Sequence, residues 1–255
     1  MALVSDIFRS RLDEFRVALS LLSRLPVPAP PPARFRNAAR AAWAYPLAGL
    51  AVACPAGFVA AILMAVDTGP AIAAGAYIAL SILFSGAMHE DGLADCADGF
   101  WGGWTVARRL EIMKDSAIGT YGFLSLIVVT GMRWSACALL LPLGIAPLLA
   151  AAMLSRAAMP PVMALLPNAR DTGLSHGTGR PGAAATVAGL VLALTLALLL
   201  TGPIALFAAV SAAIATAALA ALARAKIRGQ TGDVLGACQQ LSELAILLTF
   251  ATMLT

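Results

Sequence analysis

Seven long apolar segments run through this chain and restrict its fold more than any other feature. A helix needs roughly 20 predominantly apolar residues to cross a bilayer, and segments of about that length lie at approximately 43–66, 70–88, 120–141, 145–166, 184–201, 203–223 and 235–254. They are rich in Ala and Leu and do not alternate as strands do. We therefore predict an all-α fold, a polytopic integral membrane bundle with about seven transmembrane helices.

The composition supports a membrane protein. Only 12% of the residues are charged, about half the share found in soluble domains, so the chain lacks the polar side chains to cover a water-exposed surface. We expect residues 1–255 to form a single membrane-embedded domain. The net charge of +4 is what basic cytoplasmic loops give a membrane protein, and we expect no nucleic-acid partner. Assembly into a homo-oligomer is left open.

Residues 5–25 predict a helix of a different kind. Apolar side chains recur there at helical spacing, while Arg, Asp and Glu occupy much of the rest. Such a pattern is typical of an amphipathic helix at the membrane interface, with its basic face toward anionic lipid headgroups. The proline-rich stretch 26–32 follows and should not be helical. Residues 1–40 are thus expected to form an interfacial helix and a stiff connection.

The basic residues predict the orientation of the bundle. With the N-terminus in the cytoplasm, fifteen of the 17 Lys and Arg residues fall on the cytoplasmic side, two lie within spans, and none lies outside. So strong a bias supports seven spans with the C-terminus outside. It also places three long polar segments on the cytoplasmic face, at 89–119, 167–183 and 224–234. We expect the chemistry on that face.

The segment 89–119 holds a concentrated group of acids. Asp91, Asp95 and Asp98 stand at i, i+4 and i+7, which on a helix places them within roughly 60° of one another. Carboxylates on one face repel each other unless a cation neutralises them. Oxygen ligands suit Mg²⁺ or Mn²⁺, with substrate phosphates completing the coordination shell. Asp115 is a fourth candidate ligand, and a solvated acidic segment without a metal is the alternative.

The other two polar segments offer phosphate contacts. In 224–234, Arg228 and the backbone amides of a Gly-rich turn would suit a phosphate. The alternative is an ordinary basic loop in which Asp233 is the N-cap of the following helix. The Gly-rich segment 167–183 is either a mobile substrate loop or a flexible linker.

Three charged residues fall inside predicted spans. Charges at membrane depth are costly and normally face the bundle interior or a polar cavity. Arg133, Arg156 and Glu243 are in this position. They predict either an ion pair between Glu243 and one of the arginines or recognition of a phosphate by Arg156.

Five stretches together resemble a known enzyme family. They are SRLPVP at 23–28, HEDGLADCADG at 89–99, RRLEIMKDSAIGTYG at 108–122, SR at 155–156 and GQTGDVLGA at 229–237. Their order and spacing are similar to those of the adenosylcobinamide-GDP ribazoletransferases, the cobalamin (5′-phosphate) synthases of the late vitamin B12 pathway. The resemblance implies a multi-pass enzyme of the bacterial inner membrane that requires Mg²⁺. Such an enzyme joins adenosylcobinamide-GDP to α-ribazole or α-ribazole 5′-phosphate, releases GMP and forms adenosylcobalamin or its 5′-phosphate.

The resemblance also assigns residues. The motif carboxylates, implied as catalytic groups and metal ligands, are Asp91, Asp95, Asp98 and Asp115. Asp115 is the favoured base for the ribazole 3′-hydroxyl. Glu90 and Cys96 differ in some members of the family and are not expected to carry essential chemistry. The candidates for substrate contact are His89, Arg108, Arg109, Lys114, Ser116, Arg156, Arg228, Gln230, Thr231 and Asp233.

Two other functions stay open. The acidic motif is more distantly similar to that of CDP-alcohol phosphotransferases, but their DGxxARx₈GxxxDxxxD pattern is incomplete, because Ala94-Asp95 stands where Ala-Arg is expected. A transporter for metal ions or organic anions would also have several spans with charges inside them. Against a transporter, the acids lie in a segment on one face, and no inverted repeat is evident.

Overall fold

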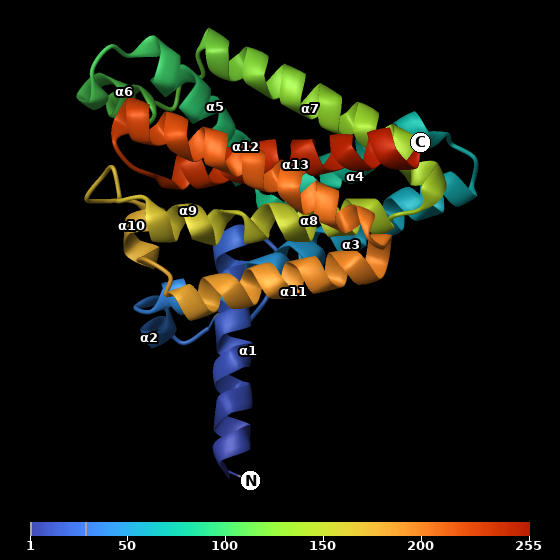
Figure 1. The fold of residues 1–255 in the computed structure, drawn as a ribbon, viewed down its shortest axis with the longest axis horizontal. Coiled ribbons are helices and arrows are strands. Elements are labelled where there is room, and N and C mark those ends of the chain that lie inside the picture. Colours follow the sequence, from blue (N-terminus) through green and yellow to red (C-terminus); the bar gives the residue numbers. More distant parts are fainter. Residues whose placement is uncertain (1, 29) are drawn as a thin grey trace.

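A computed structural model of the chain describes residues 2–28 and 30–255. Long helices run side by side in one bundle (Figure 1). Its elements are α1 (Ala2–Leu22), α2 (Pro32–Phe35), the 3₁₀ helix η1 (Ala38–Ala44), α3 (Tyr45–Ala65), α4 (Pro70–Ser85), α5 (Met88–Gly102), α6 (Val106–Ile112), α7 (Thr120–Leu140), η2 (Leu141–Leu143), α8 (Ala146–Ala157), α9 (Met159–Leu165), α10 (Leu174–Thr178), α11 (Ala183–Thr201), α12 (Ile204–Ile227) and α13 (Gly232–Leu254). The described residues form no strand, and the predicted all-α class is confirmed.

Six helical stretches are long and apolar enough to cross a membrane. They are Ala38–Ala65, Thr120–Leu143, Ala146–Leu165, Ala183–Thr201, Ile204–Ile227 and Gly232–Leu254. A seventh span results if α4 and α5, which are bent by 88° relative to each other, are counted as one. The predicted multi-pass helical bundle is therefore confirmed, with six to seven candidate spans.

The second predicted span, 70–88, ends earlier than expected. Helix α4 stops at Ser85, and the next two residues, Gly86 and Ala87, adopt left-handed conformations with φ of 70° and 57°. Left-handed residues end a helix, so the chain turns sharply before the polar sequence begins. The segment 89–119, predicted as a catalytic loop or helix, is mostly helical, since α5 has 15 residues and α6 has seven.

The fourth predicted span contains a break. Helix α8 ends at Ala157 and α9 begins at Met159. Proline has no N–H to donate and clashes with the preceding turn, which explains an interruption beside Pro160-Pro161. The stretch Ala146–Leu165 is still long and apolar enough to cross a membrane, and 78% of its apolar part is buried. Arg156, at the end of α8, therefore lies in the interior of the bundle.

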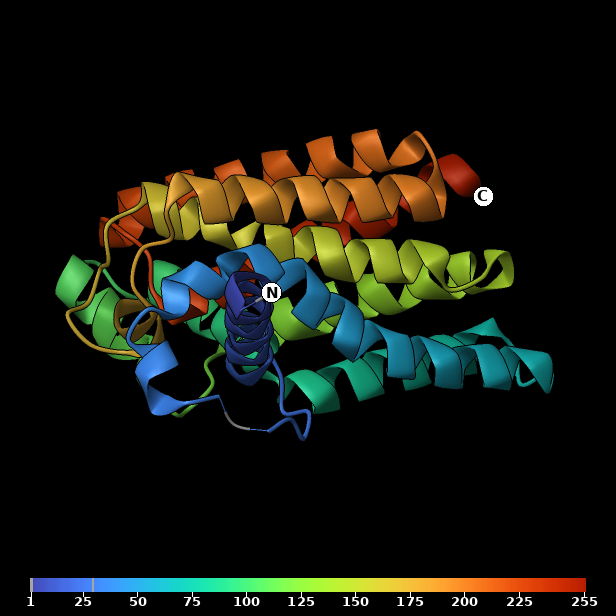
Figure 2. The same cartoon turned by 90° about the horizontal axis from the view of Figure 1, so that it is seen from below.

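Helix α1 crosses the bundle at a steep angle (Figures 1 and 2). Its C-terminal part is buried through Val17, Ala18 and Leu22, whereas its N-terminal part projects beyond the other helices. A helix that lies across the spans is oriented as an interfacial helix should be. The described residues of the proline-rich connection before Pro32 are not helical, and α2 begins at Pro32, the last residue of the stretch predicted not to be helical. Ala29 lies outside the described residues.

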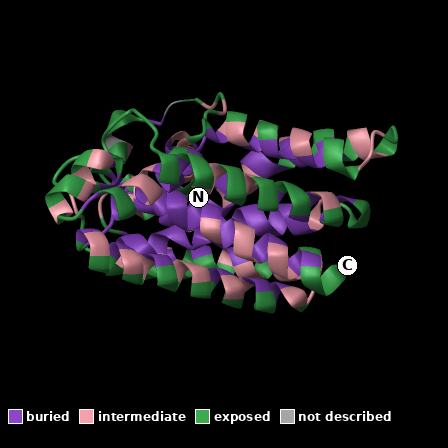
Figure 3. Cartoon of the chain, turned by 90° about the horizontal axis from the view of Figure 1, so that it is seen from above, coloured by how far each residue is buried: buried purple, intermediate pink, exposed green. Residues whose placement is uncertain are grey.

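The polar segments gather at one end of the bundle. Helices α5, α6 and α10 lie together there, and the C-terminus lies at the other end (Figures 1 and 2). The most buried spanning helices are those of Ala146–Leu165 and Gly232–Leu254, and Figure 3 shows the buried residues running along the middle of the bundle. Helix α13 thus begins at the polar end, within the GQTGDVLGA stretch, and continues as a central helix of the core.

Candidate active site

Helix α5 lies against the first turns of α13 through two glycines. A Cβ on Gly92 would stand 2.7 Å from the carbonyl oxygen of Asp233, and a Cβ on Gly236 would stand 3.2 Å from Cα of His89. Both contacts involve backbone atoms, which cannot move aside as a flexible side chain can. The two sequence motifs HEDG and GDVLG therefore meet because both supply a glycine at the helix crossing. This crossing brings Asp91 beside Asp233.

A pocket of about 280 Å³ opens at this crossing. Its lining comes from all three polar segments predicted from the sequence and consists of Met88, Asp91, Asn168, Arg170, Thr172, Gly173, Leu174, Ser175, His176, Gln230, Thr231, Gly232 and Asp233. Four of the predicted site residues are thereby brought together, namely Asp91, Gln230, Thr231 and Asp233. We regard this pocket as the candidate active site.

The turn before α13 is fixed by its own side chains. Thr231 is the N-cap and accepts a hydrogen bond from the amide of Val234 at 3.3 Å. The alternative prediction that Asp233 is the N-cap is therefore wrong. Asp233 lies in the first helical turn, where the partial positive charge of a helix N-terminus stabilises an anion. Its carboxylate accepts from the Thr231 hydroxyl at 3.1 Å and pairs with Arg170 at 3.1 Å.

The segment after α9 is bound to this turn and is not an isolated linker. The amide of Gln230 donates to the carbonyl of Pro167 at 2.8 Å, and the amide of Ala169 donates to the carbonyl of Gln230 at 2.9 Å. The buried Gln230 side chain accepts from the Ser175 hydroxyl at 2.7 Å and donates to Asn168. These bonds hold the segment that carries Arg170 at the pocket, where Arg170 is part of the lining.

The carboxylates of this region repel one another. Asp95 lies one turn along α5 from Asp91, beside the pocket. Its pKa is raised to about 7, first by partial burial and then by the charges of Asp233 and Asp91. A raised carboxyl pKa means that the charged form is disfavoured. A cation bound among these oxygens would relieve that repulsion.

The donor chemistry fits Mg²⁺ if the substrate supplies part of the coordination. Among the described residues, no three or more His, Cys, Asp or Glu side chains converge closely enough to hold a metal ion by themselves. Mg²⁺ is commonly held by one or two carboxylates together with substrate phosphates and water. The oxygens of Asp91 and Asp233 in one pocket meet that requirement.

Three of the four predicted ligands lie outside the pocket lining, and two of these, Asp98 and Asp115, are bonded to other parts of the chain. Asp98 accepts hydrogen bonds from the amides of Gly119 at 2.7 Å and Gly122 at 2.9 Å, so its carboxylate joins α5 to the start of α7. Asp115 is exposed and accepts from the amide of Ala117 at 3.0 Å, as a residue that shapes a turn does. The structure thus brings neither carboxylate to Asp91.

The basic candidates after α5 also lie away from the pocket lining. Arg108 forms an exposed pair with Glu111 at 2.8 Å. Arg109 donates to the carbonyls of Gly103 and Lys226, both at 2.9 Å, and so ties α6 to the end of α12. The exposed residues Lys114, Ser116 and Arg228 complete this group, and Arg228 ends α12 in a left-handed conformation.

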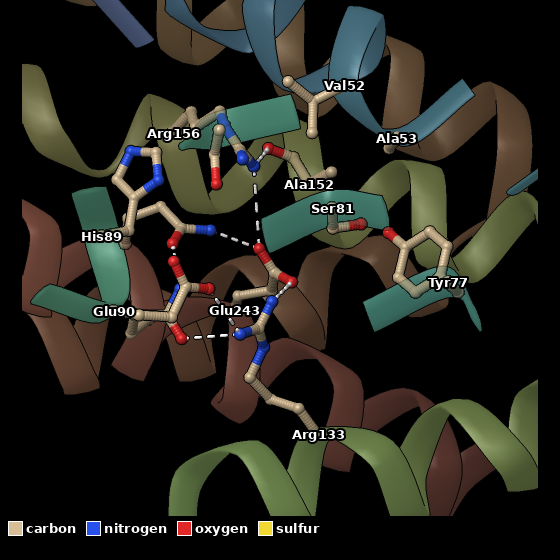
Figure 4. A pocket seen from close by; sticks show the side chains of 13 residues that line it. Val52, Ala53, Tyr77, Ser81, His89, Glu90, Arg133, Ala152, Arg156 and Glu243 are labelled. Carbon is tan, nitrogen blue, oxygen red and sulfur yellow. Dashed lines mark hydrogen bonds and ion pairs between the residues drawn. The ribbon is translucent and has the colours of Figure 1, made fainter. Parts of the chain in front are cut away.

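A second polar cluster lies inside the bundle (Figure 4). Arg133 of α7 donates to Glu243 at 2.7 Å, to Gln240 at 2.7 Å and to Glu90 at 3.2 Å. Arg156 faces the other oxygen of Glu243 at 3.6 Å. The predicted ion pair of Glu243 is confirmed, and Glu243 pairs with both arginines. The positive charges of the two arginines equal the negative charges of the two glutamates. Such pairing is what makes buried charges tolerable.

Sequence reasoning missed most of this buried cluster. Glu90 was set aside, yet it links α5 to Arg133 and accepts from Gln240 at 2.9 Å. Helix geometry could have predicted this contact, because adjacent residues on a helix point about 100° apart. Glu90 can therefore enter the bundle while Asp91 lines the pocket. His89 is 1% exposed and, with Arg156, lines the small interior cavity of Figure 4, so neither reaches the candidate active site.

Comparison with known proteins supports the resemblance. The family described as cobalamin-5-phosphate synthase matches residues 14–251. An adenosylcobinamide-GDP ribazoletransferase of Bradyrhizobium diazoefficiens is 43% identical over 97% of this chain and 96% of its own length. Proteins of the same name from a Sinorhizobium species and from Rhizobium meliloti are 44% and 41% identical, over 92% and 94% of this chain and 94% and 96% of theirs.

No solved structure matches the chain. The family match nevertheless confirms the predicted enzyme class, a membrane transferase of cobalamin synthesis, over the CDP-alcohol phosphotransferase and transporter alternatives. Two of the five stretches on which the resemblance was based, 89–99 and 229–237, contribute to the pocket between α5 and α13. With a match over nearly its whole length, this chain belongs to the cobalamin-5-phosphate synthase family.

Proposed function

We propose that the pocket between α5, α13 and the segment after α9 is where this enzyme transfers adenosylcobinamide phosphate from adenosylcobinamide-GDP to α-ribazole or α-ribazole 5′-phosphate. The ribazole 3′-hydroxyl attacks the phosphorus that bears the cobinamide. The bond from that phosphorus to the bridging oxygen breaks, GMP leaves, and the hydroxyl proton passes to a carboxylate. The observation that carries the proposal is the meeting of Asp91, Asp233 and Arg170 in one pocket to which two of the family motifs contribute.

Asp91 and Asp233 are the residues that would hold Mg²⁺. Bound there, the ion would neutralise charge on the diphosphate and polarise the attacked phosphorus. Asp98 and Asp115 remain predicted ligands from the resemblance only. Asp98 holds the start of α7 and so keeps α5 in register with its neighbour.

Asp95 is better placed than Asp115 to accept the hydroxyl proton. It lies beside the pocket, and its pKa of about 7 in the ion-free protein reflects burial and neighbouring carboxylates. A cation nearby lowers that pKa and keeps the carboxylate ionised, as a base requires. Asp115 is exposed in the turn before α7.

The pocket is proposed to open to the cytoplasm of a bacterial inner membrane. Fifteen of the 17 basic residues lie at the end of the bundle that contains it or before the first span, and cytoplasmic loops are enriched in Lys and Arg. That orientation also gives a nucleotide-linked substrate direct access from the compartment where GTP-derived groups are made.

The test is GMP release by detergent-purified protein supplied with Mg²⁺, adenosylcobinamide-GDP and α-ribazole. We expect turnover in the native protein and its loss in Asp91→Asn. The matched control is Asp67→Asn, an exposed residue at the turn between α3 and α4 whose left-handed backbone (φ 56°) asparagine tolerates. Full turnover in Asp91→Asn would refute the role of this pocket. Uptake of an anion into liposomes without GMP release would favour the transporter.

A further inference from the structure

One cationic side chain already stands among the pocket carboxylates. Nη1 of Arg170 lies 3.1 Å from Oδ2 of Asp233, and Nη2 donates to the carbonyl of Leu110 in α6 at 3.1 Å. The side chain is 15% exposed, so most of it is withdrawn from water. Its Nε is buried without a hydrogen-bond partner in the described part of the chain. The guanidinium thus has one ionic partner and at least one donor unused.

The position of this guanidinium is the one a metal ion would need. A cation that ligates Asp233 must approach the carboxylate that Arg170 now neutralises. A divalent ion and a guanidinium at one carboxylate repel each other strongly in a partly buried site. Binding of a divalent ion at Asp91 and Asp233 therefore favours a state in which Arg170 has left Asp233.

The released guanidinium has a suitable new partner in the same pocket. Arginine presents a planar fork of donors that matches phosphate oxygens. Arg170 lines the pocket together with Asp91 and Asp233, so a diphosphate bound to the ion would lie within its surroundings. Gly173, three residues later, is exposed and has no heavy atom within 4 Å of where its Cβ would stand, so no packed neighbour blocks a shift of the chain there.

We propose that Arg170 stands in for the metal ion in the substrate-free protein and moves to the substrate diphosphate when the ion binds Asp233. This inference rests on the proposed function. It assigns Arg170 two successive partners, a carboxylate and then a phosphate. The arginine keeps the carboxylates from repelling each other while no ion is bound, and it couples binding of the ion to binding of the nucleotide-linked substrate.

The test separates the two partners by measuring ion binding without substrate. Mn²⁺ binding to detergent-purified, substrate-free protein is followed by electron paramagnetic resonance of the free ion. Because Arg170→Gln removes the competing charge, we expect it to bind Mn²⁺ about tenfold more tightly than the native protein. The same variant should show a raised KM for adenosylcobinamide-GDP, because the diphosphate loses its arginine. A residue with a purely structural role would weaken both.

Two further variants make the result specific. Arg180→Gln is the matched control, since Arg180 lies in the same polar segment and donates to the carbonyl of Leu166 at 3.2 Å, with no carboxylate partner in the described chain. It should leave both Mn²⁺ binding and KM unchanged. Arg170→Lys keeps the charge and should leave Mn²⁺ binding near the native value while raising KM for adenosylcobinamide-GDP. It is the variant to measure if Arg170→Gln does not fold.

The outcomes distinguish this inference from the function on which it rests. Equal or weaker Mn²⁺ binding by Arg170→Gln than by the native protein would overturn the role of Arg170, while GMP release by the native protein would leave the proposed function intact. Absence of Mn²⁺ binding by both the native substrate-free protein and Arg170→Gln would also overturn the role of Arg170, and GMP release by the native protein would still leave the proposed function intact.

Discussion

The buried cluster around Arg133 offers the sharpest test of how this bundle is held together. Arg133 is 2% exposed and makes three polar contacts of 2.7 to 3.2 Å with Glu90, Gln240 and Glu243. Its replacement by Met would leave two buried glutamates facing a single arginine, Arg156, at 3.6 Å from Glu243. Removing one partner of a buried pair typically costs about 3–5 kcal/mol, because the other charge stays buried and uncompensated.

We therefore expect Arg133→Met to lose about 3–5 kcal/mol of unfolding free energy. The double variant Arg133→Met/Glu243→Gln restores the charge balance and should be more stable than the single variant by about 1 kcal/mol or more. The assay is equilibrium unfolding in mixed micelles with increasing dodecyl sulfate, followed by tryptophan fluorescence. Arg108→Met is the control, because it removes an exposed pair of similar length, 2.8 Å, and should barely move the midpoint. Equal loss in the single and double variants would refute the charge-balance argument.

Two further predictions concern the crossing of α5 and α13. Gly92→Ala places a Cβ 2.7 Å from the Asp233 carbonyl, so it should separate the helices and reduce GMP release; Gly131→Ala, with open space at its Cβ, should leave the rate unchanged. For Asp95, the raised pKa of about 7 against an ordinary 3.8 means that the native state binds its proton more tightly than the unfolded state. The ion-free protein should therefore lose stability as pH rises from about 4 to about 7, and saturating Mg²⁺ should flatten that loss, as unfolding midpoints in EDTA and in Mg²⁺ would show. A flat profile in EDTA contradicts the electrostatics of the pocket.

Hydropathy and charge predicted most of the fold because both act along the chain. The spans 120–141 and 184–201 were placed within one residue of the helices Thr120–Leu140 and Ala183–Thr201. Errors in the predicted helix ends arose where the backbone conformation of single residues determines where a helix stops. The left-handed residues Gly86 and Ala87 end α4 early, and no apolar pattern reports on a residue with positive φ.

The candidate site was predictable in part, and the limit is physical. The spacing of the carboxylates predicted that Asp91 and Asp95 share one helix face, because residues i and i+4 do so in any helix, independent of its neighbours. It could not show that Asp98 would be bonded to the start of α7, or that Arg170 would reach Asp233, since such contacts depend on how separate helices pack. Sequence spacing constrains residues within one element, and partners from different elements follow only from the tertiary structure.

Helix α5 joins the two polar clusters of the protein, and this explains the composition of its first turn. Glu90 enters the bundle and meets Arg133, whereas the adjacent Asp91 lines the pocket. Helix α5, which is bent by 88° from α4, packs Leu93 and Phe100 into the apolar core and adds a polar anchor at its first turn. The buried salt bridge of Glu90 supplies that anchor at the residue next to the proposed ion ligand, where a small rotation of α5 would displace Asp91 most directly. A charged interior thereby fixes the position of the carboxylates at the polar end.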